Sequence, residues 1–368
     1  MSASIRRRDI VDYVWEDRSV LGRAARAILT PLEHLFGAVV ARRNAKFDKM
    51  SSTPASLSAL SVGNLTVGGT GKTPIAAWCA ARLRVLGANP AIVLRGYGDD
   101  EWRVHALLNP HTPIVIAKDR RIGLITARTR GADCAVFDDA FQHRQAPRIA
   151  DLVLLSADNW NGTLRLLPAG PFREPMRALE RADVAVITVK AATDMQVATL
   201  QSAIVREVPN IEIAIVRLVP DILRLASSLS HPVHPALIRD HAQAKSLTHP
   251  ISWLAGREIV VASAIGDPPA FEAQLARAGA VLRRVHRFQD HHVYTAVDAA
   301  AIAHDAHGSE GVVCTLKDAV KLAPIWPREA AALWYLSQTV VVDRGAEALD
   351  RVFARVLAAR AATTPTAG

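Results

Sequence analysis

Few folds accommodate the order of residues at positions 61–74, which is Ser-Val-Gly-Asn-Leu-Thr-Val-Gly-Gly-Thr-Gly-Lys-Thr-Pro. The apolar run from Leu57 to Val62 is typical of a buried strand, while Pro74 and the alanine-rich stretch after it are typical of the first turn of a helix. A strand, a glycine loop and a helix in this order make a P-loop, in which backbone N–H groups and the positive end of a helix surround a phosphate. The segment therefore predicts a nucleotide triphosphate as the ligand.

The predicted phosphate cradle consists of Gly68, Gly69, Thr70, Gly71, Lys72 and Thr73. Its lysine would reach the β- and γ-phosphates, and its final threonine would hold Mg²⁺. One position departs from the usual pattern, because Thr66 stands where a glycine is normally found. A tight turn without a ligand would explain two adjacent glycines, but it would not explain Lys-Thr-Pro at the start of a helix.

Apolar runs alternate with helical patterns along the rest of the chain, which favours a parallel sheet covered by helices. In the first half we predict strands at 57–62, 91–94, 113–117, 134–137, 152–155, 184–189 and 211–219. Prolines and histidines interrupt the rhythm between residues 220 and 256, and a shorter α/β series follows. The predicted architecture is α/β, with an N-terminal basic amphipathic helix at 1–50, a P-loop core domain at 51–225 and a smaller C-terminal α/β domain at 226–368.

Charge and composition narrow the class of partner. The chain has 44 Lys and Arg against 35 Asp and Glu, a net charge of +9, which predicts an anionic partner. Only 5% of the residues are aromatic and they do not alternate with basic ones, so binding to nucleic acid is not expected. An anionic lipid surface or a phosphorylated substrate is the better prediction, and nothing in the sequence indicates an obligate protein partner.

The first fifty residues combine arginines with an apolar stripe. The arginines are Arg6, Arg7, Arg8, Arg23, Arg26, Arg42 and Arg43, and the stripe contains Trp15, Leu21, Ile28, Leu29, Leu32, Leu35, Phe36, Val39 and Val40, many of them at helical spacing. Pro31, Glu33 and His34 interrupt the stripe, so we expect no segment that spans a bilayer. Two interpretations stay open: a helix lying at a membrane surface with its arginines on anionic headgroups, or a helix packed on its own domain.

Acidic residues follow two of the predicted strands. Asp138 and Asp139 end the strand that starts at Cys134, where P-loop enzymes place the acid that binds Mg²⁺. Beyond the strand at 91–94 come three more carboxylates, Asp99, Asp100 and Glu101. Ligands collect at the carboxyl ends of parallel strands, so one of these groups is a candidate to accept the proton of an attacking hydroxyl. A solvated acidic turn is the alternative for this second segment.

Other polar residues are candidates for supporting roles. His291 follows Asp290 in an Asp-His-His sequence, which favours a histidine that tunes a base over a metal site, because consecutive residues seldom bind one ion. Candidates for orienting phosphate or an anionic substrate are Arg120, Gln142, His143 and Arg173. Capping, core-edge positions or surface salt bridges are the alternatives for these four residues.

Seven motifs, taken together, resemble those of the tetraacyldisaccharide 4′-kinases, the lipid A disaccharide kinases of Gram-negative bacteria. They are the P-loop segment at 62–74, Leu-Arg-Gly-Tyr-Gly at 94–98, Lys-Asp-Arg at 118–120, Asp-Asp-Ala-Phe-Gln-His-Arg at 138–144, Leu-Pro-Ala-Gly-Pro-Phe-Arg-Glu-Pro at 167–175, Phe-Gln-Asp-His-His at 288–292 and Thr-Leu-Lys-Asp-Ala-Val-Lys-Leu at 315–322. They follow the family's order and cover roughly residues 15–345. Thr66 is itself part of the family's version of the P-loop.

The resemblance implies a peripheral membrane kinase at the cytoplasmic face of the bacterial inner membrane. Such an enzyme moves the γ-phosphate of ATP, with Mg²⁺, to the 4′-hydroxyl of a tetraacylated glucosamine disaccharide 1-phosphate, the lipid A disaccharide 1-phosphate. Carried over by position, the resemblance assigns ATP and Mg²⁺ to Lys72 and Thr73, the metal also to Asp138 and Asp139, and the anionic groups of the substrate to Arg120 and Arg173. A lipid substrate also favours the interfacial interpretation of the N-terminal helix.

The resemblance identifies the catalytic base less directly than it identifies the other site residues. The family's base lies in a Gly-Asp-Glu-Pro segment and is paired with a histidine of its Asp-His-His motif. Here Gly98-Asp99-Asp100-Glu101 followed by Trp102 replaces that segment. We predict Asp100 as the base, with His291 as the residue that tunes it, and Asp99 as the alternative.

Two other classes of protein stay open on the sequence alone. One is a P-loop GTPase or ATPase that drives metal insertion or protein assembly, which would need a water-positioning residue. A GTPase would usually also contain an Asn-Lys-x-Asp segment, and the chain has none. The other class is a nucleotide-binding scaffold held at a membrane by residues 1–50.

Overall fold

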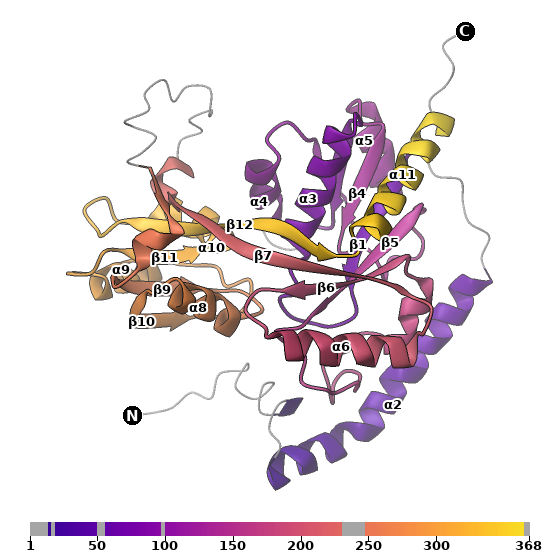
Figure 1. Ribbon diagram of the computed structural model, residues 1–368, viewed down its shortest axis with the longest axis horizontal. Coiled ribbons are helices and arrows are strands. Elements are labelled where there is room, and N and C mark those ends of the chain that lie inside the picture. Colours follow the sequence, from indigo (N-terminus) through magenta and orange to yellow (C-terminus); the bar gives the residue numbers. More distant parts are fainter. Residues whose placement is uncertain (1–13, 16–18, 50–55, 97–99, 230–246, 364–368) are drawn as a thin grey trace.

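The structure of the protein is a computed structural model, which describes residues 14–15, 19–49, 56–96, 100–229 and 247–363. Its strands form one twelve-stranded sheet in the order β10-β9-β11-β12-β7-β6-β5-β1-β4-β2-β3, with β8 paired to β7 beside this path. Neighbouring strands are parallel except where β7 pairs with β12 and with β8. The predicted α/β architecture, a mostly parallel sheet covered by helices, is confirmed (Figure 1).

The half of the sheet from β3 to β7 carries the phosphate loop and is called the larger half. Its strands are β1 (Ser58–Asn64), β2 (Pro90–Leu94), β3 (Ile114–Ile116), β4 (Cys134–Asp138), β5 (Ala150–Ser156), β6 (Val184–Val189) and β7 (Glu212–Leu225). Its helices are α3 (Lys72–Val85), α4 (Glu101–Leu108), α5 (Arg120–Thr129), α6 (Asp194–Glu207) and a 3-10 helix at Met176–Arg181. Along β1, Leu60 packs in the core with α3 and Ala59 in the core with α5. This strand is therefore buried on both faces, and each of its seven residues is buried, without an alternation of buried and exposed positions.

The smaller half contains β9 (Glu258–Ser263), β10 (Val281–Arg287), β11 (Val312–Thr315) and β12 (Leu333–Arg344). Three helices accompany these strands, α8 (Pro268–Arg277), α9 (Ala296–Asp305) and α10 (Leu316–Leu322). The short elements are β8 (Thr248–Pro250) and 3-10 helices at Ala226–Leu229, Ile251–Leu254 and Ala323–Ile325. A second α/β series after residue 256 is thus confirmed.

A two-stranded antiparallel ribbon joins the halves. β7 and β12 pair from Ile215 with Arg344 to Leu225 with Trp334, and Figure 1 shows them running together from one half to the other. After β12 the chain returns to the larger half, where α11 (Ala346–Thr363) packs Phe353 into the core that also holds residues of β1 and α3. The division at residue 225 stays a prediction, with α11 lying against the larger half.

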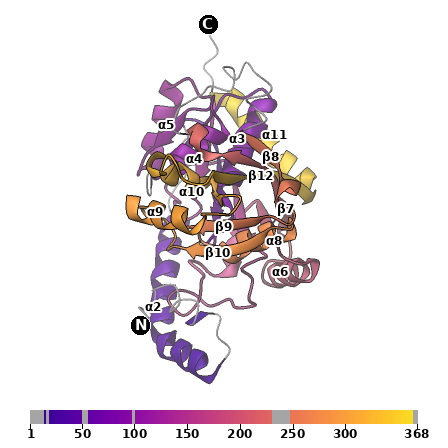
Figure 2. The same cartoon turned by 90° about the vertical axis from the view of Figure 1, so that its left-hand side faces the viewer.

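The N-terminal helix α2 (Val20–Asp48) lies along the lower edge of the molecule and extends beyond it (Figures 1 and 2). Pro31, Glu33 and His34 do not end the helix, since α2 continues through all three. By length and composition alone, α2 is apolar enough to cross a membrane, and 6% of its most apolar window is buried. Glu33 is paired with Arg165 of the protein body, 2.8 Å away. Arg6, Arg7 and Arg8 lie outside the described residues.

Candidate active site

The phosphate loop joins the end of β1 to the start of α3 and depends on glycine at two positions. Gly68 and Gly71 have φ angles of +108° and +81°, in the left-handed region that disfavours side chains. A Cβ atom on Gly71 would also lie 2.7 Å from Leu218 Cδ1. Among the described residues, no side chain caps the start of α3, so the first N–H groups of that helix are directed at the loop. The local geometry is that of a cradle for an anionic group.

Side chains from several strand ends brace this loop. Asn64 donates from Nδ2 to the Thr66 carbonyl at 2.6 Å and to Thr70 Oγ1 at 3.0 Å. Thr188, on β6, donates to the Thr70 carbonyl at 2.9 Å. Lys190 donates from Nζ to the Gly69 carbonyl at 2.7 Å and to Asp267 Oδ2 at 2.8 Å, and Asp267 caps α8 of the smaller half. The loop is thus held from both halves of the molecule.

The predicted metal residues Thr73 and Asp138 lie together. Parallel pairing of β1 with β4 sets Val62 beside Asp138, and Thr73 Oγ1 donates to Asp138 Oδ2 at 3.2 Å. Asp138 is 5% exposed, and its Oδ1 atom is buried without a hydrogen-bond partner in the described part of the chain. A hydroxyl and a carboxylate oxygen are the hard donors that Mg²⁺ prefers, so the residues fit that ion.

The described ranges contain no group of three or more histidine, cysteine, aspartate or glutamate side chains arranged to hold a metal alone. A magnesium ion beside Thr73 and Asp138 would therefore complete its coordination with phosphate and water oxygens, which is its usual mode of binding at nucleotide sites.

Asp139 faces the opposite direction, toward cationic side chains. Arg173 donates to Asp139 Oδ1 at 3.0 Å, and the same guanidinium contacts Asn64 Oδ1. Burial raises the pKa of Asp139, but the charges of Lys72, Arg173 and Arg120 outweigh it, so the pKa lies below its usual value. The φ angle of Asp139 is +54°, a strained conformation for a residue with a side chain. Asp139 therefore stays ionised within reach of the phosphate loop.

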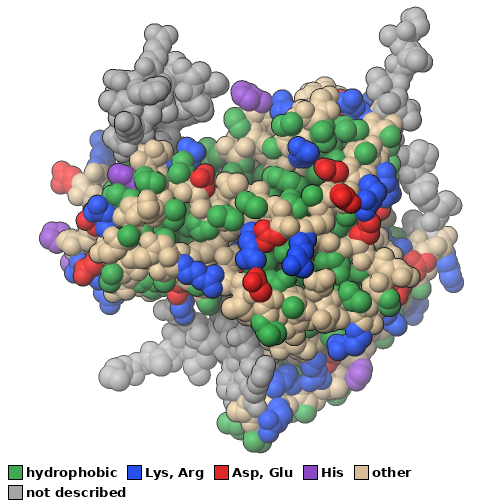
Figure 3. All heavy atoms as spheres, in the orientation of Figure 1, with side chains coloured by type: hydrophobic (Ala, Val, Ile, Leu, Met, Phe, Trp, Pro, Cys, Tyr) green, Lys and Arg blue, Asp and Glu red, His purple; other side chains and the backbone are tan. Residues whose placement is uncertain are grey.

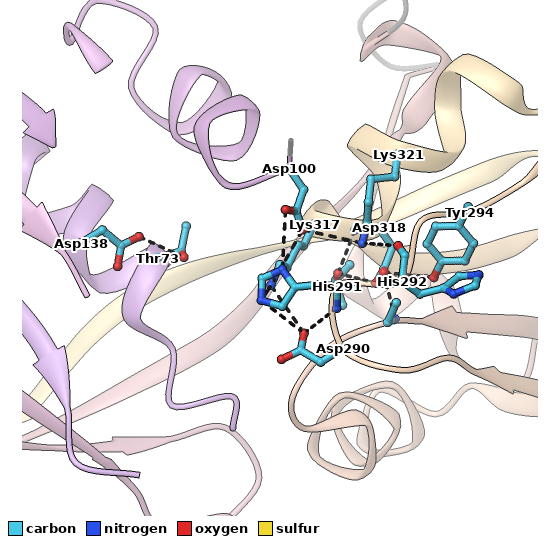
Figure 4. A network of polar contacts seen from close by, with 12 residues as sticks. Thr73, Asp100, Asp138, Asp290, His291, His292, Tyr294, Lys317, Asp318 and Lys321 are labelled. Carbon is cyan, nitrogen blue, oxygen red and sulfur yellow. Dashed lines mark hydrogen bonds and ion pairs between the residues drawn. The ribbon is translucent and has the colours of Figure 1, made fainter. Parts of the chain in front are cut away.

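Asp100, the predicted base, lies at the junction of the two halves and is 2% exposed. His291 Nδ1 lies 3.7 Å from its Oδ1 atom, and the Nζ atoms of Lys317 and Lys321 lie 3.8 and 3.6 Å from its Oδ2 atom. Burial raises the pKa of Asp100, but contact with His291 and the two lysine charges lower it to about 2. Figure 4 shows Asp100 between the Thr73–Asp138 pair and the His291 group. Asp99 lies outside the described residues.

His291 comes from the segment between β10 and α9 and has a left-handed φ of +61°. Contact with Asp100 raises the pKa of His291, against the opposing effects of burial and the Lys317 charge. The Lys317 ammonium lies 3.3 Å from His291 Nε2 and 3.5 Å from Asp290. The predicted pairing of Asp100 with His291 is thus present as a spatial contact, and it joins the two halves.

Glu101 is the next residue after Asp100 and begins α4. Burial, followed by the nearby charge of Asp138, raises the pKa of Glu101 from 4.5 to about 7. A carboxyl group that is affected by the charges of both Asp138 and Asp100 thus takes up a proton near neutral pH. The raised pKa of Glu101 could not be predicted from the neighbouring residues in the sequence, because Asp138, at the end of β4, comes close to α4 only in the fold.

The four predicted substrate residues occupy different environments. Arg120 is buried and donates to the backbone carbonyls of Ala117 at 2.6 Å and Asp138 at 3.3 Å. Gln142 donates to the Asn64 carbonyl at 2.9 Å. Burial and the charges of Arg120 and Arg95 lower the pKa of His143. Arg173 contacts Asp139, as described above, and the substrate role of all four stays a prediction.

Sequence reasoning missed Lys317, Lys321, Lys190 and His105 as site residues. The spacing of Lys317 and Lys321 was a usable signal, because residues four apart in Thr-Leu-Lys-Asp-Ala-Val-Lys-Leu share one face of a helix. That face of α10 points toward Asp100 (Figure 4). Lys190 and His105 carried no comparable signal, since each is isolated in the sequence.

A cleft of about 1140 Å³ lies between the phosphate loop and the smaller half. It is lined by the phosphate loop from Gly68 to Pro74, by Glu101 and Lys190, and by Asp290, His291 and Lys317 from the smaller half. Phosphoryl transfer needs groups that bind the triphosphate on one side and a carboxylate that orients the acceptor hydroxyl on the other. The protein contributes little covalent chemistry. Fold and site together therefore define a P-loop kinase.

Comparison with known proteins gives the family. The model of the tetraacyldisaccharide-1-P 4′-kinase family matches residues 25–358, and the chain belongs to that family. A tetraacyldisaccharide 4′-kinase of Bradyrhizobium diazoefficiens is 30% identical over 80% of this chain and 82% of its own length. One from Anaeromyxobacter sp. Fw109-5 is 33% identical over 93% of this chain and 95% of its own length.

A solved structure shares the fold. LpxK of Aquifex aeolicus, crystallised as an apo form in complex with ATP, superposes with a TM-score of 0.66, covering 90% of this chain and 99% of that chain at 24% identity. The predicted kinase class is confirmed by the family match. A P-loop GTPase or ATPase for metal insertion or protein assembly is not favoured.

Proposed function

We propose that the protein transfers the γ-phosphate of ATP to the 4′-hydroxyl of a tetraacylated glucosamine disaccharide 1-phosphate, in the synthesis of lipid A. Family membership supports the reaction class. The observation that carries the assignment is the buried Asp100 carboxylate beside His291, a histidine that lines the same cleft as the phosphate loop. An enzyme that only hydrolysed nucleotide would not require a second buried carboxylate on the acceptor side.

On the nucleotide side, the backbone of Gly68, Gly69, Thr70 and Gly71 would surround the β- and γ-phosphates, with Lys72 adding its charge. Thr73 and Asp138 would hold Mg²⁺, and Asp139 would support that site while paired with Arg173. The ion, when bound, neutralises charge that develops on the transferring phosphoryl group. Lys72 and the loop amides share that task from the protein.

On the acceptor side, Asp100 would orient the sugar hydroxyl in line with the phosphate. Because the pKa of Asp100 is about 2, this carboxylate is ionised at neutral pH and is a weak base. Its main contribution is therefore to position the hydroxyl and to accept its proton once transfer has acidified it. His291 would stabilise the ionised form of Asp100. Asp99 remains the alternative base.

Arg120, Gln142, His143 and Arg173 are proposed to bind the anionic and polar groups of the acceptor. Arg173 has the strongest support, because its side chain is partly exposed beside the metal residues. Arg120 has the weakest direct support, since its guanidinium is occupied with backbone carbonyls. In addition to the proposed contact with the acceptor, Arg120 would hold the end of β4 in position through the Asp138 carbonyl.

Helix α2 is compatible with peripheral membrane association, and we assign it to the anionic cytoplasmic face of the inner membrane. Its polar residues Thr30, Glu33, Asn44 and Asp48 contact Arg165, Glu174 and Arg144 of the protein body. These contacts would be lost if the helix spanned a bilayer, so they favour a helix lying at the interface.

The opposite side of α2 supports the same assignment. Leu21, Ile28, Leu32, Leu35 and Val39 are exposed and recur at helical spacing. Lys and Arg side chains gather along the same edge of the molecule (Figure 3). Apolar side chains among acyl chains with cations at the headgroups are the features of an interfacial anchor.

The test is ADP release by the purified protein with and without lipid A disaccharide 1-phosphate in mixed micelles. Acceptor-dependent turnover is expected, and Lys72→Ala should abolish it without unfolding the protein. Arg206→Ala, on the far surface of α6, is the matched control that should retain full activity. Acceptor-independent ADP release would instead indicate a nucleotide hydrolase, and no turnover with intact nucleotide binding would indicate a scaffold.

A further inference from the structure

His105 is a buried histidine on α4 that the mechanism above does not use. It lies one helical turn after Glu101, on the helix whose N-terminal cap is Asp100. Its side chain is fully buried, and its Nε2 atom lies 2.9 Å from Oδ2 of Asp138. An ionised carboxylate only accepts hydrogen bonds, so Nε2 is the nitrogen that carries the proton.

Two donors therefore converge on one oxygen of Asp138. Oδ2 accepts from His105 at 2.9 Å and from Thr73 at 3.2 Å, whereas Oδ1 is buried and has no partner in the described part of the chain. A carboxylate held at one oxygen by two fixed donors cannot rotate freely. The second oxygen is then presented in a constant direction, which is what a metal ligand requires.

Packing alone does not account for this histidine. Its Nδ1 atom is buried and lacks a hydrogen-bond partner among the described residues. Burying an unsatisfied polar atom costs about 1–3 kcal/mol, whereas a leucine of similar volume would fill the same space without that cost. The compensating feature in the structure is the bond to Asp138.

We propose that His105 is a positioning residue for the divalent cation of the nucleotide complex, acting through Asp138. By holding Oδ2, it directs Oδ1 toward the ion that Thr73 and the phosphates share. The same bond ties α4, which begins beside Asp100, to the end of β4. The distance between the Asp100 and Asp138 carboxylates is thereby kept constant. The inference rests on the proposed function for the identity of the ion and the nucleotide.

The experiment compares His105→Leu with His105→Gln in the full-length protein. Leucine keeps the volume and removes the donor, whereas the terminal amide of glutamine replaces the Nε2 donor. Mn²⁺ binding is measured by electron paramagnetic resonance in the presence of a non-hydrolysable ATP analogue, and binding of the analogue alone is measured by calorimetry without metal. Mutation of a residue that hydrogen-bonds to a metal ligand typically lowers metal affinity by about 10–100-fold.

We expect His105→Leu to weaken Mn²⁺ binding at least tenfold while analogue binding without metal stays within twofold, and His105→Gln to restore most of the metal affinity. Equal losses of metal and analogue affinity, or no loss of metal affinity, would overturn the proposal, because either result indicates a purely structural histidine. If the leucine variant does not fold, His105→Gln against His105→Asn decides, since asparagine is too short to donate at the Nε2 position.

A remote pair gives the matched control. His286 Nε2 lies 3.0 Å from Asp305 Oδ2 in the smaller half, and His286→Leu should leave Mn²⁺ binding unchanged. The Mn²⁺ measurement uses no acceptor, so it tests the role of His105 independently of the proposed kinase function. Mn²⁺ binding that depends on His105, in a wild-type protein without acceptor-dependent turnover, would refute the proposed function and leave this inference standing.

Discussion

Asp100 shows at the scale of one residue how burial and charge oppose each other. Loss of water would by itself raise the pKa of this carboxyl group, yet His291, Lys317 and Lys321 bring it down to about 2. All three partners belong to the smaller half, while Asp100 belongs to the larger half. The ionised state of the proposed base thus depends on contact between the two halves.

Replacement of Asp100 by asparagine should lower kcat by about 10²–10⁴-fold, the usual contribution of a positioned acid or base, with little change in KM for MgATP. The amide keeps the shape but cannot accept the hydroxyl proton. Steady-state kinetics with saturating acceptor measure the effect, and Asp99→Asn is the matched comparison, expected to stay within about threefold of wild type. The reverse ranking would assign the base to Asp99.

Glu101 predicts a pH dependence of stability. Its pKa is about 7 in the folded protein and 4.5 ordinarily, so folding favours the protonated form. This contribution is complete below pH 4.5 and is lost as the pH rises through 7. Glu101→Gln should therefore melt a few degrees higher than wild type at pH 8, and the difference should disappear toward pH 4.5.

Melting curves at several pH values in one buffer series provide the measurement for Glu101→Gln. The exposed Glu347→Gln at the start of α11 is the matched control, for which no pH-dependent difference is expected. A constant difference between Glu101→Gln and wild type at all pH values would mean that the folded-state pKa is not raised.

At the scale of elements, local pattern predicted the strands and the phosphate loop well. Apolar runs such as 184–189 coincide with observed strands because burial on both faces leaves no room for polar residues. The contacts of Lys190 and His105 could not be predicted, because each depends on which elements approach each other in space. For α2, sequence pattern predicted a helix with an apolar stripe but not its contacts with the protein body, since the contacts of Glu33 are long-range.

If the apolar side of α2 binds membranes, a single charge on that side should weaken the binding. Ile28 is 77% exposed on its apolar side, and Ile28→Asp should reduce co-sedimentation with vesicles containing anionic lipid by severalfold, because the charge must enter the acyl region. Met195→Asp, at a residue of α6 that is 75% exposed, is the matched control and should sediment as wild type does. Equal sedimentation of Ile28→Asp and wild type would return α2 to the packed-helix interpretation.

At the scale of the whole molecule, contacts between distant parts of the chain join the two halves. The ribbon of β7 and β12 crosses between the halves, and α11 then packs against strands formed near the start of the chain. Ser58 donates to the Val356 carbonyl at 2.8 Å, a bond that joins positions 298 residues apart. Such contacts have no signature in a local pattern, so the packing of α11 against the larger half could not be predicted from the sequence.

Phe353 provides the test of that long-range packing. It is almost fully buried, and its ring lies edge-on to Trp78 of α3 with centroids 5.7 Å apart. Phe353→Ala should destabilise the protein by about 3–5 kcal/mol through the cavity that it leaves, and α3 carries the phosphate loop at its start. Chemical denaturation followed by Trp fluorescence measures the loss, which MgATP should partly restore by binding the folded state. A loss below about 1 kcal/mol would mean that α11 is only loosely attached.

The contacts between α2 and the protein body set how this kinase would meet its acceptor. Glu33 binds Arg165, and Asn44 binds Glu174, the residue that follows Arg173 in sequence. A helix anchored in this manner fixes the height and tilt of the cleft above the lipid headgroups. On the proposed membrane, collisions between enzyme and acceptor are then confined to two dimensions, so that the saturation of the enzyme follows the mole fraction of acceptor in the surface and not its concentration in bulk.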